Sequence, residues 1–115
     1  MEPYQEVAVA FAEALVARNF GRARDMLTPA LREVVFENDL EERLTRMYRS
    51  YAKSEPSRAE FVPDGTLETW PDKQSGDLGW AYVSIEGKDF NEAVFVLVSE
   101  VEGRPMIGEV RWGRP

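Results

Sequence analysis

The change of hydrophobic period near residue 55 constrains the fold of this chain more than any other feature of its sequence. Before it, apolar residues recur at three- and four-residue steps, which is the spacing of an amphipathic helix. After it, short runs rich in Val, Ile, Phe, Tyr and Trp lie between turns that contain Gly or Pro, which is typical of strands. Helices followed by strands predict one α+β domain over residues 1–115, with the helices on one face of an antiparallel sheet.

Helical spacing is found over residues 3–18, 21–27, a short segment from Pro29, and about 38–53. Thr28 before Pro29 predicts an N-cap followed by a proline at the first helical position. Asn38 and Glu41 have the spacing of a capping box, which predicts that the last helix begins there. The apolar stripe of that helix consists of Leu40, Leu44, Met47, Tyr48 and Tyr51.

The second half predicts strands over residues 59–62, 66–70, 80–85, 93–101 and 106–112. Pro63-Asp64-Gly65 is typical turn chemistry and predicts a turn between the first two of these strands. Residues 71–79 are polar and predict a loop. Short connections at Gly87 and Gly103 predict that the last three strands form a meander. Residues 94–98 are apolar without alternation, so both faces of that strand should be covered, and the helices can cover only one.

Composition excludes several classes of function. The 14 basic and 21 acidic residues give a net charge of −7, and the basic residues are scattered, which disfavours binding to nucleic acid or to membrane surfaces. The chain has no His and no Cys, so the commonest general base, thiolate chemistry and the usual zinc ligands are absent. We therefore expect no metal and no cofactor. Without a membrane-length apolar run or a basic leader, the expected location is the cytoplasm.

The order of elements resembles the nuclear transport factor 2-like superfamily. The resemblance covers nearly the whole chain and rests on patterns of residue type at Phe11-Ala12-Glu13-Ala14-Leu15, Asn19-Phe20, Ala23, Met26-Leu27-Thr28-Pro29 and the closing strand 107–113. It implies three N-terminal helices packed on a curved antiparallel sheet, a cone-shaped α+β barrel that often encloses a pocket. It also implies a homodimer through the outer sheet face, which would cover the second face of the apolar strand. The dimer residues would be Val94, Phe95, Val96 and Val98.

Large aromatic residues are the candidate lining of that pocket, because pockets combine apolar walls with a few polar groups. The candidates are Tyr48, Tyr51, Trp70, Trp80, Tyr82 and Trp112. Tyr48 is the strongest, since it lies on the apolar stripe and carries a hydroxyl that needs a partner. The competing interpretation is that these residues are ordinary core and rim.

Glu109 is the candidate acid or base, since a carboxylate in a closed pocket can act as one. Strand alternation favours the opposite interpretation. If Trp112 faces the helices, Glu109 and Arg111 point outward, toward solvent or a dimer contact.

These observations favour a non-catalytic binding domain that holds a small apolar ligand in the cone or a protein partner on its surface. One alternative is an isomerase or lyase that works with carboxylate and Tyr groups only. The superfamily's His-dependent dehydratase and cyclase activities do not transfer to a chain without His. The other alternative is a protein-neutralising role, in which the acidic surface meets a basic partner.

Overall fold

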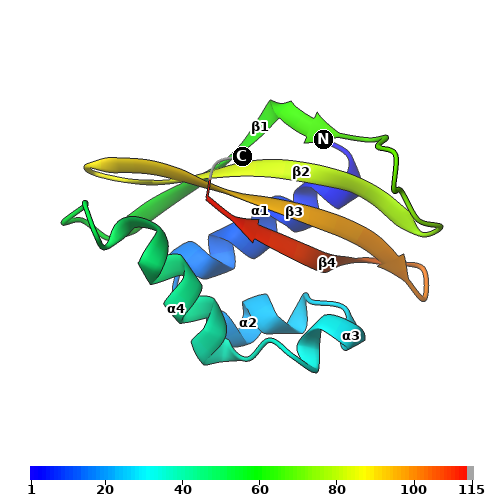
Figure 1. Ribbon diagram of the computed structural model, residues 1–115, viewed down its shortest axis with the longest axis horizontal. Coiled ribbons are helices and arrows are strands. Elements are labelled where there is room, and N and C mark those ends of the chain that lie inside the picture. Colours follow the sequence, from blue (N-terminus) through cyan, green and yellow to red (C-terminus); the bar gives the residue numbers. More distant parts are fainter. Residues whose placement is uncertain (114–115) are drawn as a thin grey trace.

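Helices precede the sheet in the computed structural model, which describes residues 1–113 (Figure 1). Within these residues the helices are α1 (Pro3–Val16), α2 (Phe20–Asp25), α3 (Pro29–Arg32) and α4 (Glu37–Tyr48). The strands are β1 (Pro56–Leu67), β2 (Asp77–Gly87), β3 (Phe90–Val101) and β4 (Arg104–Trp112). The α+β class is confirmed. The three helices that the resemblance implied are not confirmed, because two short helices, α2 and α3, stand between the two long ones, in line with the four helical segments of the sequence.

The four strands form one antiparallel sheet in the order β1-β2-β3-β4, which confirms the meander of the last three strands. The β3–β4 connection is a two-residue turn in which Glu102 and Gly103 both have positive φ. Strands β1 and β4 are the two edges and do not pair with each other in residues 1–113. The sheet described there is therefore open, and the cone-shaped barrel that the resemblance implied is not confirmed.

The helix starts follow local capping, with one correction. The hydroxyl of Thr28 accepts a hydrogen bond from the Leu31 N–H at 3.3 Å, as the Thr-Pro pair predicted. Helix α4 begins at Glu37, and its N-cap is Phe36 rather than Asn38. The reason is that the Asp39 carboxylate reaches back to the Phe36 N–H at 2.8 Å, so the acidic residue that closes the first turn lies two positions earlier than Glu41.

The predicted turn at Pro63-Asp64-Gly65 is an irregular stretch inside one strand, β1. Val62 pairs with Tyr82 and Leu67 with Trp80, so β1 carries three more residues than β2 over this interval. The Thr66 hydroxyl donates to the Val62 carbonyl at 3.2 Å and accepts from the Tyr82 N–H at 3.3 Å. This side chain replaces ladder bonds that the irregular backbone does not make, which is why the chain bulges instead of reversing.

All helices lie on one side of the sheet, and the core fills the space between them (Figure 1). Helix α1 packs against all four strands, with Ala8, Phe11 and Leu15 fully buried. Three residues expected at the dimer face, Val94, Val96 and Val98, are fully buried in this core. That assignment is therefore wrong for them, since alternation turns only Phe95 of the four toward the outer face.

A register shift between Leu97 and Val98 disrupts the alternation of β4. Leu97 pairs with Glu109, whereas Val98 pairs with Ile107, so Gly108 is an extra residue on β4. As a result Ile107 is buried in the core, although strict alternation grouped it with Glu109 and Arg111. Val110 and Trp112 also pack against the core, on the same side.

Gly79 should be essential for the contact between α1 and β2. A Cβ placed there would lie 2.4 Å from a ring carbon of Tyr4, which is only 7% exposed. We expect Gly79→Ala to lower the free energy of unfolding by about 1–3 kcal/mol through overpacking. The matched control is Gly21→Ala in α2, where the nearest atom is 3.5 Å away, and which should be neutral or stabilising by up to about 1 kcal/mol. Urea unfolding of both variants measures this, and equal effects would contradict it.

Candidate functional site

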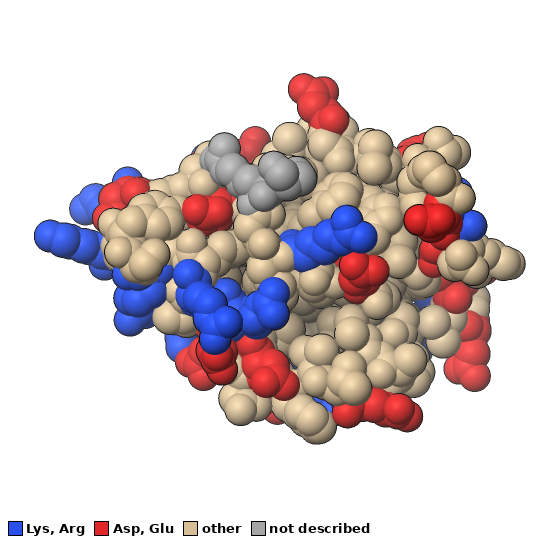
Figure 2. Space-filling model, in the orientation of Figure 1, with Lys and Arg blue, Asp and Glu red and all other residues tan. Residues whose placement is uncertain are grey.

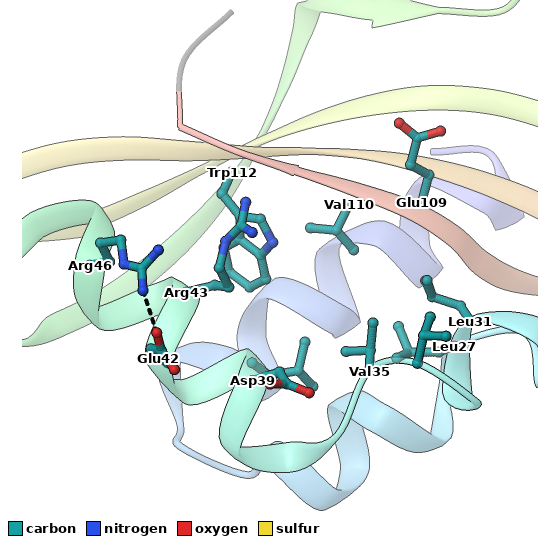
Figure 3. Close-up of a pocket in the computed structure, with 12 residues that line it drawn as sticks. Leu27, Leu31, Val35, Asp39, Glu42, Arg43, Arg46, Glu109, Val110 and Trp112 are labelled. Atoms are coloured by element: carbon teal, nitrogen blue, oxygen red, sulfur yellow. Dashed lines mark hydrogen bonds and ion pairs between the residues drawn. The ribbon is translucent and has the colours of Figure 1, made fainter.

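A groove of about 430 Å³ lies between the α3–α4 region and β4, and we call it the α4–β4 groove (Figure 3). Its walls are apolar: Leu27, Leu31, Val34, Val35, Leu40, Val110 and Trp112. Its rim is charged: Asp39, Glu42, Arg43, Arg46 and Glu109. An apolar hollow of this size with a few polar groups at its mouth is the usual form of a ligand site.

Two segments far apart in the sequence form the walls. The side chains of Val110 and Trp112 extend from β4 toward the helices, and those of Leu31 and Val35 approach from the opposite side (Figure 3). The register shift at Gly108 is what turns Val110 and Trp112 to this side. The link between α3 and α4 supplies Val34, which is 70% exposed, so apolar surface at the groove stays open to solvent.

Most of the charged side chains at the rim already have a partner. Arg46 forms an ion pair with Glu42, and Glu109 forms one with Arg111 at 3.0 Å. The Asp39 carboxylate accepts the Phe36 N–H. Arg43 is exposed and has no ion-pair or hydrogen-bond partner within residues 1–113. One cation at the mouth of the groove is thus left for a ligand.

Helix α4 is also polarised along its length. Glu37 and Asp39 lie in its first turn, whereas Arg43, Arg46 and Arg49 follow at three-residue spacing toward and just beyond its C-terminal end. Figure 2 shows Lys and Arg side chains gathered over the α4 side of this face. Arg46 pairs with Glu42 and Arg49 with Glu55, so Arg43 is the arginine that favours an anionic group at the groove.

The six predicted pocket residues do not converge on one site. Trp112 alone lines the α4–β4 groove. Trp70, Trp80 and Tyr82 lie on the outer sheet face together with Phe95. We call these four residues the outer aromatic cluster. Trp80 stacks on Phe95 at 4.9 Å between ring centroids, Trp70 meets Trp80 edge-on at 6.3 Å, and the Arg111 guanidinium lies 4.5 Å from the Trp80 ring.

The two tyrosines of the α4 stripe have structural positions. Tyr48 is fully buried, and its ring stacks on Phe90 at 4.7 Å. Its hydroxyl bonds to the Glu55 carboxylate, which also pairs with Arg49 at 2.9 Å. Tyr51 is 56% exposed and bonds through its hydroxyl to Glu92. Neither residue lines the α4–β4 groove, so their assignment to a ligand pocket has no support from this groove.

Glu109 is poorly placed to act as an acid or base in the groove. It is exposed, it pairs with Arg111, and its carboxylate points away from the groove in Figure 3. A general base needs to reach the reacting proton within a closed site, and this carboxylate faces the opposite side of the sheet. The outward orientation that strand alternation favoured for Glu109 and Arg111 is the one the structure has.

Sequence reasoning missed the residues that matter most in the groove, above all Arg43 and Val110. A signal for part of the site was present in Val34-Val35-Phe36, an apolar run just before α4. Val34 and Phe36 of this run remain exposed in the structure, at 70% and 51%. Val34 lines the groove, whereas Phe36 lies outside it beneath the Arg24 guanidinium, so this run marked the groove only in part.

Other kinds of site find no support among residues 1–113. No group of three acidic side chains in that stretch lies close enough to hold a metal ion. None of its helices has both the length and the apolar character needed to cross a membrane. No protein-family model, no curated protein and no solved structure matches the chain significantly. The site must therefore be interpreted from its own geometry.

The buried Tyr48 predicts alkaline sensitivity. Burial, and then the hydrogen bond to Glu55, raise the pKa of Tyr48 above its usual value, and burial also raises the pKa of Tyr4. A raised pKa means that the folded state keeps its proton longer than the unfolded state. The contribution to stability is thus complete below about pH 10 and is lost as the pH rises through the folded-state pKa.

We expect the free energy of unfolding to fall above about pH 10, and Tyr48→Phe to make this fall shallower while leaving the part that Tyr4 contributes. Urea unfolding between pH 8 and about 11 tests this. Parallel pH profiles for the wild type and Tyr48→Phe would contradict it.

Proposed function

We propose that this chain is a non-catalytic binding domain whose ligand has an apolar body and a negatively charged group, and that the ligand lies in the α4–β4 groove. The observation that carries the proposal is the combination of apolar walls with an unpaired arginine, Arg43, at the rim. The walls favour the apolar body through the hydrophobic effect. Arg43 favours a carboxylate or similar group, since a guanidinium binds such anions through two parallel hydrogen bonds.

Affinity should come mainly from the apolar walls. Arg43 is exposed, so its attraction for an anion is screened by water and contributes roughly 1 kcal/mol or less. Arg43 instead determines the orientation of the ligand and the preference of the groove for an anion. The acidic side chains of the rim do not oppose this role strongly, since Glu42 and Glu109 are already paired with Arg46 and Arg111.

We also propose membership of the nuclear transport factor 2-like superfamily, with the sheet as one wall of a cone. Support comes from the order of helices before strands, from the β2-β3-β4 meander and from the placement of all helices on one sheet face. The enzyme alternative has less support because Glu109 faces away from the groove. The face shown in Figure 2 carries charges of both signs, so this face offers no continuous acidic surface for the protein-neutralising alternative.

Indole NMR signals of the three Trp residues test the groove directly. Titration with decanoate, an apolar chain with one carboxylate, should shift the indole N–H signal of Trp112. The signals of Trp70 and Trp80 on the outer face should not move, which makes them internal controls. Shifts confined to Trp70 and Trp80, or no shift at all, would contradict the proposed site.

Arg43→Ala should weaken decanoate binding by roughly 2- to 5-fold, since an exposed charge pair contributes at most about 1 kcal/mol. Arg104→Ala is the matched control, because Arg104 is also exposed and without an ion pair in residues 1–113 but does not line the groove. Binding of decanol, which lacks the charge, should be unchanged in both variants. An equal loss of decanoate binding in both variants would show that general charge, rather than Arg43, attracts the anion.

The outer aromatic cluster supports a second proposal, a homodimer through the sheet face opposite the helices. Trp70, Tyr82 and Phe95 are only half-buried there, and no helix of residues 1–113 covers them. Light scattering at micromolar concentration should give about twice the 13.1 kDa mass of the chain. Phe95→Arg should reduce the mass to that of one chain without loss of helical circular dichroism. A wild-type monomer would overturn the dimer and leave the groove proposal intact.

A further inference from the structure

The outer edge of β4 carries backbone groups without partners, next to the α4–β4 groove. The Gly113 N–H donates to the Ala93 carbonyl of β3 at 2.9 Å. In an antiparallel ladder the hydrogen-bonded positions alternate. The backbone N–H and C=O groups of Glu109 and Arg111 therefore also point toward β3. The N–H and C=O groups of Val110 and Trp112 then point away from β3, toward the open edge. No other hydrogen bond of these two backbone positions is found within residues 1–113.

The chain itself already uses this edge one step earlier. The Ile107 N–H donates to the Met26 carbonyl at 2.8 Å, and the Ile107 carbonyl accepts the Thr28 N–H at 2.8 Å. Leu27 thereby forms a parallel bridge with Ile107. Pro29 then begins α3 and directs the chain away from β4. The edge thus accepts an extended segment at Ile107 and is left open at the next two outward-facing positions, Val110 and Trp112.

The open edge and the groove are parts of one surface. The side chains of Val110 and Trp112 line the groove, while their backbone groups form its upper border (Figure 3). An extended chain placed along this border would hydrogen-bond to β4 and direct every second side chain into the groove, because strand side chains alternate. An acidic side chain two positions from an apolar one lies on the same face, so it would be within reach of Arg43 at the Trp112 end.

We propose that the occupant of the α4–β4 groove is an extended peptide segment of a partner protein, which adds to the edge of β4 and places an apolar side chain in the groove and an acidic one at Arg43. This inference rests on the proposed function and names the class of its ligand. Addition of a strand to a sheet edge combines affinity from main-chain hydrogen bonds with specificity from side-chain pockets. The groove and the edge provide both features at one place.

A peptide fits the surface better than the other occupants. A small amphipathic anion fills the groove and meets Arg43, but it has no repeating amide groups to pair with Val110 and Trp112. A second copy that pairs Val110 with the other copy's Trp112 places the two Arg111 side chains directly opposite each other. Like charges at opposed strand positions are destabilising.

The test uses an array of acetylated and amidated heptapeptides in which Val, Leu or Ile stands two positions from Asp or Glu, so that both face the groove, with Ser or Thr at the positions between them. Peptides that bind the full chain are then examined by amide hydrogen exchange. Val110 and Trp112 should exchange fast in the free protein and at least about tenfold more slowly with peptide. Glu109 and Arg111 are the controls in the same strand, since their amides already face β3.

The variant Val110→Pro tests the hydrogen bonds at the edge of β4 separately from the apolar contacts in the groove. Proline keeps an apolar side chain but removes an N–H that makes no bond to β3, a change that edge strands tolerate. We expect this variant to lose at least about tenfold in peptide affinity, whereas Val110→Ala, which keeps the N–H and only shortens the groove-lining side chain, should lose less. If it does not fold, the exchange pattern of the wild type still provides the test.

The outcomes distinguish the two proposals. Binding of decanoate without binding of any array peptide overturns the peptide occupant and leaves the proposed function standing. Peptide binding that leaves Val110 and Trp112 exchanging fast also overturns it, since the edge is then unused. Protection of both amides that appears without peptide and rises with protein concentration shows a second copy at the edge, which overturns it as well. Failure of both decanoate and peptides to bind removes the proposed function itself.

Discussion

The register shift at Gly108 is the constraint on which the site depends. It leaves Ile107 in the core and turns Val110 and Trp112 to the same side of the sheet two residues later. A strand without this extra residue would place Ile107 on the opposite face from Val110 and Trp112. Either Ile107 or the pair Val110 and Trp112 would then point away from the helices. Gly108 suits the position, because a Cβ there would come within 3.1 Å of the Ser99 hydroxyl. The groove thus depends on a local irregularity in the strand that borders it.

The same sheet shows why a continuous apolar run is ambiguous. Residues 94–98 suggested a strand covered on both faces, and the helices cover the inner face as expected. On the outer face, part of the cover comes from side chains of the neighbouring strands, since Trp80 stacks on Phe95 and Arg111 lies over Trp80. Large aromatic and arginine side chains can shield a strand without a second layer of backbone. The run therefore indicates burial but does not identify what provides it.

Features that depend on near neighbours in sequence were predictable, and features that depend on register were not. Thr28-Pro29 formed the predicted cap because its partners are within three residues. The start of α4 was predicted at the wrong residue, because two acidic residues, Asp39 and Glu41, could each have closed its first turn. Only Asp39 bonds back to the start of the helix. The Pro63-Asp64-Gly65 turn failed because Thr66 bonds to Tyr82, a residue of another strand. Long-range pairing of this kind leaves no periodic signal in the sequence.

The candidate site was mostly missed for the same reason. Trp112 was identified, but the other five aromatic residues lie in the core, at the surface or on the outer face. Residue type indicated that large amphipathic side chains matter, and did not indicate which face each one occupies. Val110 and Arg43 had no distinguishing feature in the sequence, since an apolar residue in a strand and a charged one on a helix are both ordinary. Only the spatial meeting of β4 with α4 makes them parts of one groove.

Net charge and local charge lead to different conclusions about partners. A total of −7 disfavours association with extended polyanions, whose many phosphates interact with the whole surface. A single carboxylate in the groove interacts mainly with charges within about 8–10 Å at physiological salt. Arg43 is unpaired within residues 1–113 and lies near Trp112, whereas Arg46 and Arg49 are paired with Glu42 and Glu55. Glu37 and Asp39 stand in the first turn of α4, where the helix dipole favours them. An acidic protein can therefore select an acidic segment, provided that the segment is short and enters at the arginine end of the groove.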